Sequence, residues 1–163
     1  MTMVAVSWSN VAPVVEEIKI DREISVAALE IESIQNKIAR DLSDPRYSDG
    51  SICVIELDFP EKVRYVGLGV DPDPRNCGNI DGEWLILNST IVYALENGAK
   101  KKIFLKTDDV QFRPGFLNKN GEWVLDSDGS SRNHDMGVVI ENPSGKYYFE
   151  LVFTNRTYTM ARF

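Results

Sequence analysis

The chain has 163 residues, of which 43% are hydrophobic and 26% are charged. This composition excludes collagen-like, low-complexity and wholly disordered proteins, and we expect a single domain over residues 1–163. The 25 acidic residues outnumber the 18 basic ones and give a net charge of −7. Because this surplus repels phosphate backbones, we expect no general nucleic-acid binding.

The sequence has no pattern that directs a chain into or across a membrane. Residues 3–6 are apolar but follow no basic segment, so they do not resemble a signal peptide, and no run of about 18 apolar residues occurs. We therefore expect a cytoplasmic protein without membrane contact. Cys53 and Cys77, with a single histidine, are too few for a disulfide framework or structural zinc. Cys53 is expected in the core and Cys77 at the surface.

An amphipathic helix is predicted near the N-terminus, within a helical segment over residues 1–45. Its apolar positions recur every three or four residues. They are Ile24, Ala27, Ala28, Ile31, Ile34, Ile38 and Leu42. Asp21 or Ser25 is expected to cap its start, and Asp44 before Pro45 to end it. Residues 10–20 fit either a helix or a strand, and we favour a short helix.

Strand patterns replace the helical spacing in the β-rich body, residues 50–163. Apolar and polar residues alternate here, and turn residues recur at short intervals. We expect hairpins with turns at the following places: Pro60-Glu61, Asn97-Gly98, Asn120-Gly121 and residues 142–145. A helix between Ser89 and Gly98 is an alternative to the second hairpin, which we favour because this segment is rich in β-formers.

These elements predict an α+β fold. An N-terminal amphipathic helix would pack on a mainly antiparallel β-sheet, sandwich or partly open barrel of about eight strands. Residues 158–163 are expected to add an edge strand, and Tyr148 to lie on the face opposite the core. Gly67 and Gly69 form a G-x-G that Pro72 prevents from opening a phosphate-binding helix, so they indicate a bulge or a close backbone approach.

Two polar loops are the candidate contact surfaces, because binding residues concentrate on loops. The first covers residues 71–82 and the second residues 126–135. The candidate residues in these loops are Asp71, Asp73, Arg75, Asn76, Asp126, Asp128, Arg132 and His134.

One basic cluster could bind an anion. Lys100, Lys102 and Lys106 share one face of a strand with a period of two, and Arg113 follows soon after. The alternative, which we favour, is that these lysines protect a sheet edge against pairing with other chains.

The second loop also offers two chemical possibilities. Asp126, Asp128 and Ser130 could supply oxygen ligands to calcium, although a plain loop is the favoured interpretation. His134, the single histidine, could act as a general base with Asp126 or Asp135. Neither pattern matches an established motif, so we expect no metal and no cofactor.

The absence of a catalytic motif favours binding over catalysis. We expect a non-enzymatic protein-interaction module of the inhibitor, immunity or viral accessory type. A binder of a small ligand, either a sugar or an anionic metabolite held by aromatic residues with Lys106 and Arg113, is the first alternative. A hydrolase using His134 is the second.

Overall fold

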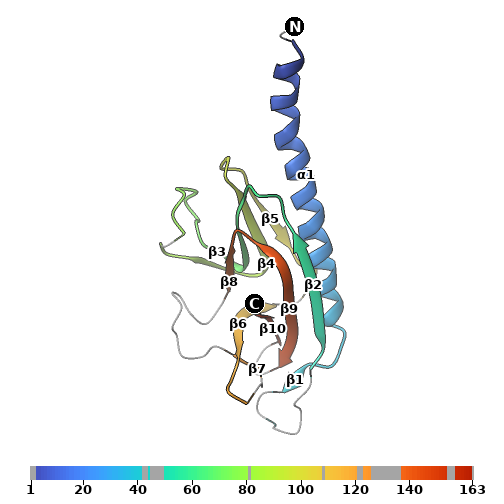
Figure 1. The fold of residues 1–163 in the computed structure, drawn as a ribbon. Coiled ribbons are helices and arrows are strands. Elements are labelled where there is room, and N and C mark those ends of the chain that lie inside the picture. Colours follow the sequence, from blue (N-terminus) through green and yellow to red (C-terminus); the bar gives the residue numbers. More distant parts are fainter. Residues whose placement is uncertain are drawn as a thin grey trace.

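The computed structural model describes residues 3–41, 44, 50–80, 82–107, 109–120, 123–125, 137–153 and 157–162. Within these residues a long helix precedes strands that form two sheets, which makes the fold α+β (Figure 1). The elements are α1 (Met3–Ile34), β1 (Arg40–Asp41), β2 (Ile52–Asp58), β3 (Val63–Asp71), β4 (Leu85–Leu95), β5 (Lys100–Phe104), β6 (Gln111–Leu117), β7 (Trp123–Leu125), β8 (Val138–Glu141), β9 (Ser144–Phe153) and β10 (Thr157–Arg162).

The two sheets are mostly antiparallel. The larger one has the order β1-β9-β10-β6-β7, with β2 also paired to β9, and the smaller one has the order β5-β4-β3-β8. The predicted edge strand at the C-terminal end is β10, but its position is different. It lies inside the larger sheet because it pairs with β9 on one side and, in parallel, with β6 on the other.

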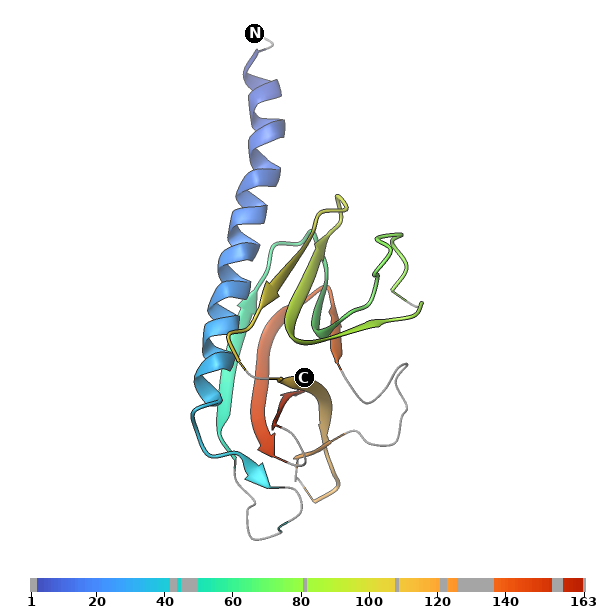
Figure 2. The ribbon, with the colours of Figure 1, turned by 180° about the vertical axis from the view of Figure 1, so that it is seen from behind.

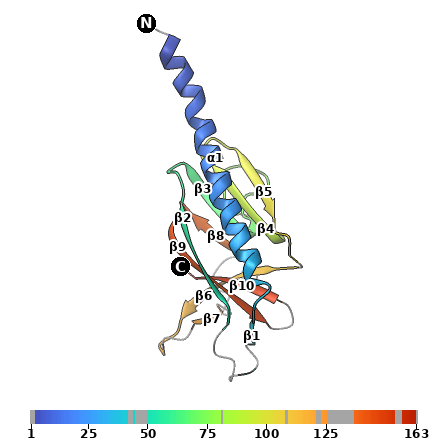
Figure 3. The same ribbon diagram turned by 90° about the vertical axis from the view of Figure 1, so that its right-hand side faces the viewer.

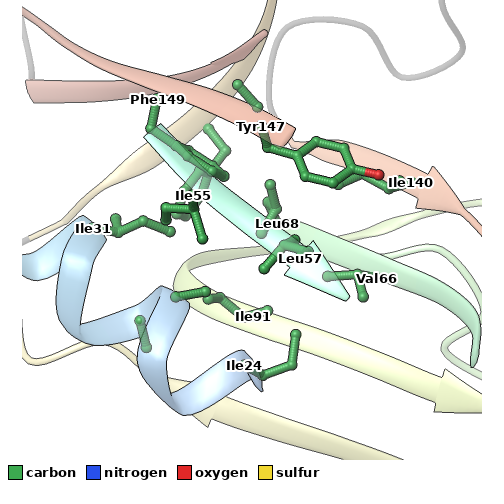
Figure 4. Close-up of a cluster of buried hydrophobic side chains, with 14 of the residues drawn as sticks. Ile24, Ile31, Ile55, Leu57, Val66, Leu68, Ile91, Ile140, Tyr147 and Phe149 are labelled. Carbon is green, nitrogen blue, oxygen red and sulfur yellow. The ribbon is translucent and has the colours of Figure 1, made fainter. Parts of the chain in front are cut away.

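The main core lies between α1 and the two sheets. Figure 4 shows Ile24 and Ile31 of α1 on one side of a cluster that includes Leu57 of β2 and Phe149 of β9. Burial along β2 alternates strictly, so every second residue points into this core. The expected outward position of Tyr148 is confirmed, because its two neighbours in β9 are buried while Tyr148 is exposed.

Helix α1 differs from the predicted helix at both ends. The predicted apolar positions from Ile24 to Ile34 are buried, but Ile38 is 76% exposed and Leu42 lies outside the described residues. The chain leaves the helix after Ile34, whose carbonyl accepts the N–H of Lys37 three residues later. The predicted end at Asp44 is therefore wrong. The chain turns earlier because residues 40–41 pair with β9 as β1.

The predicted caps are also wrong, because α1 begins almost twenty residues before them. Asp21 and Ser25 lie inside the helix, where the Ser25 hydroxyl donates to the Asp21 carbonyl at 2.6 Å. The ambiguous residues 10–20 are helical, as favoured, but they belong to this one continuous helix. The N-terminal half of α1 projects beyond both sheets (Figure 3).

The hairpins predicted at the Asn-Gly steps are confirmed. β4 pairs with β5 and β6 pairs with β7, both antiparallel. Gly98 has a φ of 87°, which a residue with a side chain seldom adopts, and this is why the Asn-Gly signal was informative. The alternative helix between Ser89 and Gly98 is not formed.

The other two predicted hairpins are wrong, because in each the consecutive strands enter different sheets. β2 pairs with β9 in the larger sheet, while β3 pairs with β8 in the smaller one. The four strands therefore form one long antiparallel ribbon that bends where it passes between the sheets. At the bend, residues 59–64 on one side face only residues 142 and 143 on the other. The turn residues mark these corners rather than hairpins.

The prediction for Gly67 and Gly69 is confirmed. The pairing of β3 with β4 has an irregularity between Leu68 and Val70, and Gly69 has a φ of 70°. A Cβ atom on Gly67 would lie 2.3 Å from the carbonyl oxygen of Val70, so no larger residue fits there. This close approach lets the chain after β3 fold back over the outer face of the smaller sheet, where Tyr65 belongs to a second small core.

Candidate functional site

The candidate site is a buried ionic cluster beneath the segment between β3 and β4. This segment lies on the side of the molecule remote from α1 (Figure 2). β5 supplies its cations, because alternate residues of a strand share a face. The ammonium groups of Lys100 and Lys102 lie 3.0 and 3.2 Å from Oδ2 of Asp71. The expectation that these two lysines share a face is therefore confirmed.

Asp71 is the centre of this cluster. Its side chain is 1% exposed, and the Tyr65 hydroxyl lies 3.5 Å from its Oδ1. Burial by itself would raise the pKa of this carboxyl, but the hydrogen bonds from Lys100 and Lys102 hold the pKa below its usual value. Burial beside Asp71 raises the pKa of Tyr65, which therefore stays protonated.

Asp73 fixes the loop that follows. Its two carboxylate oxygens accept the backbone N–H groups of Cys77 and Gly78 at 2.8 and 2.7 Å. The guanidinium of Arg64 lies 3.7 Å from the same carboxylate, and Lys100 donates to the Asp73 carbonyl at 2.7 Å. The turn over residues 73–78 is therefore held by the Asp73 carboxylate and by two cations, one from β3 and one from β5.

The outer side of this loop is exposed to solvent. Residues 74–79 are exposed, although Asp73 immediately before them is buried. The side-chain amide of Asn76 donates to the Gly98 carbonyl at 3.1 Å, which joins the loop to the β4–β5 turn. We call residues 74–79 the anchored loop, because it is exposed above and fixed below.

A pocket of about 510 Å³ lies beside the anchored loop. It is lined by Asp73, Pro74, Arg75, Cys77, Asn79, Gly82, Glu83, Trp84 and Leu85. Trp84 donates from its indole nitrogen to the Ile80 carbonyl at 2.8 Å, which fixes the ring position. An aromatic ring beside groups of both charges is an arrangement that can hold a small polar ligand.

The structure places the predicted loop residues at two depths. Asp71 and Asp73 are buried and support the loop from within, whereas Arg75 and Asn76 are exposed on it. A role for Asp71 or Asp73 in direct contact with a partner therefore has no support from their position. The predicted residues of the second loop, Asp126, Asp128, Arg132 and His134, lie outside the described residues.

The predicted anion patch is divided between the two sheets. Lys100 and Lys102 lie on β5 of the smaller sheet, whereas Arg113 belongs to β6 of the larger one. Lys106 follows β5, and its backbone N–H donates to Glu32 of α1 at 2.8 Å. Because Asp71 already neutralises part of the charge of the first two lysines, anion binding by this set stays a prediction. β5 is at the edge of its sheet, where lysines discourage pairing with another chain.

Sequence reasoning missed a second ionic cluster on the other face of β5. Lys101 points towards α1, where its ammonium lies 2.8 Å from Glu17 and 2.6 Å from Asp21. Asp21 also accepts a hydrogen bond from the Tyr93 hydroxyl. Burial would raise the pKa of Asp21, but the bonds from Lys101 and Tyr93 lower it. The only signal was the i, i+4 spacing of Glu17 and Asp21, which puts both on one helix face.

The two cysteines lie as expected. Cys53 is buried in the core, and Cys77 is exposed and lines the pocket. Burial and the neighbouring carboxylate of Glu30 raise the pKa of the Cys53 thiol, so it is protonated at neutral pH.

Two further kinds of site are absent from the described part of the chain. It contains no group of three or more histidine, cysteine, aspartate or glutamate residues placed to hold a metal ion. No helix in it has the length and apolar character that crossing a membrane requires. Comparison of the chain with protein-family models, curated proteins and solved structures finds no match.

Proposed function

We propose that this chain is a non-enzymatic, cytoplasmic protein-interaction module that contacts another protein through the anchored loop. The observation that carries the proposal is the contrast between the two sides of residues 74–79. Asp71 and Asp73 hold the segment from below by ionic and backbone hydrogen bonds, and the outer side chains are exposed. A loop that is already ordered loses little conformational entropy when it binds.

The chemistry of the loop favours a protein surface as its partner. Arg75 offers a planar guanidinium to a carboxylate, and Pro74 and Cys77 offer small apolar surfaces beside it. A nucleic acid is disfavoured because the chain carries a net charge of −7.

A capture experiment with matched charge reversals tests this proposal. Wild-type protein, Arg75→Glu and Lys119→Glu would be immobilised and exposed to lysate of the source cells. Both changes reverse one exposed cation, but Lys119 lies at the β6–β7 turn, away from the anchored loop. We expect one stoichiometric protein with the wild type and with Lys119→Glu, and its loss with Arg75→Glu. Capture that survives Arg75→Glu at unchanged melting temperature would exclude the anchored loop as the contact surface.

The pocket beside the loop supports a second candidate, a binder of a sugar or an anionic metabolite. Its volume of about 510 Å³ is in the range of small-ligand sites, and Trp84 provides an aromatic wall. A thermal-shift screen of sugars and organic anions would separate the two functions. Ligand-dependent stabilisation that Trp84→Ala abolishes would favour the small-ligand function. An unchanged melting temperature with every sugar and organic anion would count against that function.

A further inference from the structure

Helix α1 has two apolar stripes on opposite faces. The first packs on the sheets and consists of Ile20, Ile24, Ala27, Ala28, Ile31 and Ile34, all buried. The second consists of Val14, Val15, Ile18, Val26 and Leu29, whose exposed fractions lie between 49% and 63%. At about 100° per residue, Leu29 lies within about 20° of Ile18 around the axis, whereas Ile20 lies about 160° away. We call the second set the exposed stripe.

The sequence continues the exposed stripe into the projecting half of the helix. The positions follow one another at steps of four and three residues, which is the heptad spacing of helices that coil around each other. They are Val4, Trp8, Val11, Val15 and Ile18. Residues 1–15 contain no charged residue, so this end of the helix has no ionic face to turn towards water.

The projecting half needs a partner for stability. Among the helix residues from 14 onward, the buried stripe begins at Ile20. Glu16 and Glu17 still form ion pairs with Lys62 and Lys101 of the body, and α1 extends beyond the sheets before this turn (Figures 1 and 3). A free helical segment of this length is marginal in water, and Pro13 removes one of its backbone hydrogen bonds. Because the exposed stripe faces away from the sheets, another helix can reach it without meeting the body of the protein.

We propose that α1 associates with α1 of further copies of this chain, parallel and in register, along the exposed stripe. In that arrangement each apolar position meets its own copy, from Val4 to Ile18, and Val26 and Leu29 are covered as well. An antiparallel pair of projecting halves would leave Val26 and Leu29 exposed. Arg22 and Ser25 form two successive polar layers in the stripe, and polar residues at such positions specify the register of a coiled coil at a cost in stability.

The residue types also indicate the number of helices. One heptad position holds Trp8, Val15, Arg22 and Leu29. The other holds β-branched residues at Val4, Val11 and Ile18, where a two-stranded coiled coil prefers leucine. This combination favours three helices over two. We therefore expect a trimer with three times the chain mass of 18.4 kDa, about 55 kDa.

Light scattering on the purified full chain tests the association. The variant Val15→Glu/Ile18→Glu puts charges into the stripe, and Val54→Glu is the control because Val54 is equally exposed but lies on β2. We expect about 55 kDa for the wild type and the control, and 18.4 kDa for the double variant with unchanged sheet signal in circular dichroism. A dimer that the double variant dissociates would support the same interface. A monomeric wild type, or an oligomer that survives in the double variant, would overturn the proposal.

Cysteine cross-linking tests the parallel arrangement. In a Cys77→Ser background, Val4→Cys introduces a thiol at one of the heptad positions, and Ser9→Cys introduces one about 140° away around the helix axis. We expect covalent dimers under oxidation from Val4→Cys and few from Ser9→Cys. Equal cross-linking of the two would overturn the proposal, as would a monomer that sediments with phospholipid vesicles. These outcomes are independent of the anchored loop, so failure here leaves the proposed function to its own test.

Discussion

The two faces of β5 carry ionic clusters built from consecutive lysines, yet the clusters differ in depth. On the outer face, the Lys100 side chain is 14% exposed and its partner Asp71 is 1% exposed. On the face towards α1, Lys101 is 42% exposed and Asp21 is 39% exposed. Strand alternation sends neighbouring residues into these different surroundings, although nothing in the sequence of three lysines distinguishes them.

The comparison teaches that burial, rather than contact distance, decides what an ion pair contributes. The Lys101–Asp21 contact of 2.6 Å is shorter than the Lys100–Asp71 contact of 3.0 Å. Solvent screens the exposed pair, which therefore contributes little to stability. The buried carboxylate cannot be left without its cations, because an uncompensated charge in the interior is strongly destabilising. We therefore expect the outer cluster to have the larger effect in every test below.

The largest expected effect is that of Asp71→Ala. Removing this carboxylate leaves the ammonium of Lys100 mostly buried without its counter-charge and releases Asp73 from one hydrogen-bond partner. The free energy of unfolding should fall by about 3 kcal/mol. Urea denaturation measures this loss, with Glu17→Ala, which removes an exposed partner of Lys101, as the matched control at about 1 kcal/mol or less. Equal losses in the two variants would show that depth does not separate the clusters.

Acid should weaken the outer cluster next. The pKa of Asp71 in the folded protein lies below its ordinary value of 3.8, because Lys100 and Lys102 oppose the effect of burial. The stabilisation is therefore fully present above pH 3.8 and is lost as pH falls through the folded pKa. Asp71→Asn should remove part of the pH dependence of the urea midpoint in this range. Asp21→Asn should remove less, and the reverse order would contradict the comparison.

The smallest expected effect is that of Lys101→Met. The long side chain keeps its apolar part, and only a solvent-screened charge is lost from beside Glu17 and Asp21. We expect a loss of about 0.5 kcal/mol that shrinks further in high salt. Lys100→Met should cost several times more in the same urea assay. A loss with Lys101→Met that matches Lys100→Met would mean that the α1-facing cluster is as strongly coupled as the buried one.

Local patterns in the sequence were sufficient for several elements. The stripe from Ile24 to Ile34 predicted the buried face of α1, because helix periodicity is a property of the segment itself. The Asn-Gly step at residue 97 predicted the β4–β5 hairpin, because positive φ at Gly98 closes a tight turn. The shared face of Lys100 and Lys102 followed from the strand period in the same way.

Pairing between distant segments could not be predicted in this way. Pro60-Glu61 and residues 142–145 were correctly identified as places where the chain turns, but a turn signal does not say which strand the next segment joins. The burial of Asp71 has the same origin, because its cations come from β5, about thirty residues later in the chain. A loop aspartate and a buried aspartate have the same neighbours in sequence, and only the fold separates them.

The bent ribbon of β2–β3 with β8–β9 has a consequence for how the chain folds. It joins Ile52 to Glu150, nearly one hundred positions apart, and its larger-sheet portion packs under α1. The helix can form early from local contacts, but the surface that buries Ile24 and Ile31 is assembled only when β9 has paired. Folding rates fall as contacts become more distant in sequence. During synthesis on the ribosome, the stripe of α1 that packs on the sheets therefore stays exposed until the last quarter of these residues has been made, and during that period a chaperone could bind it.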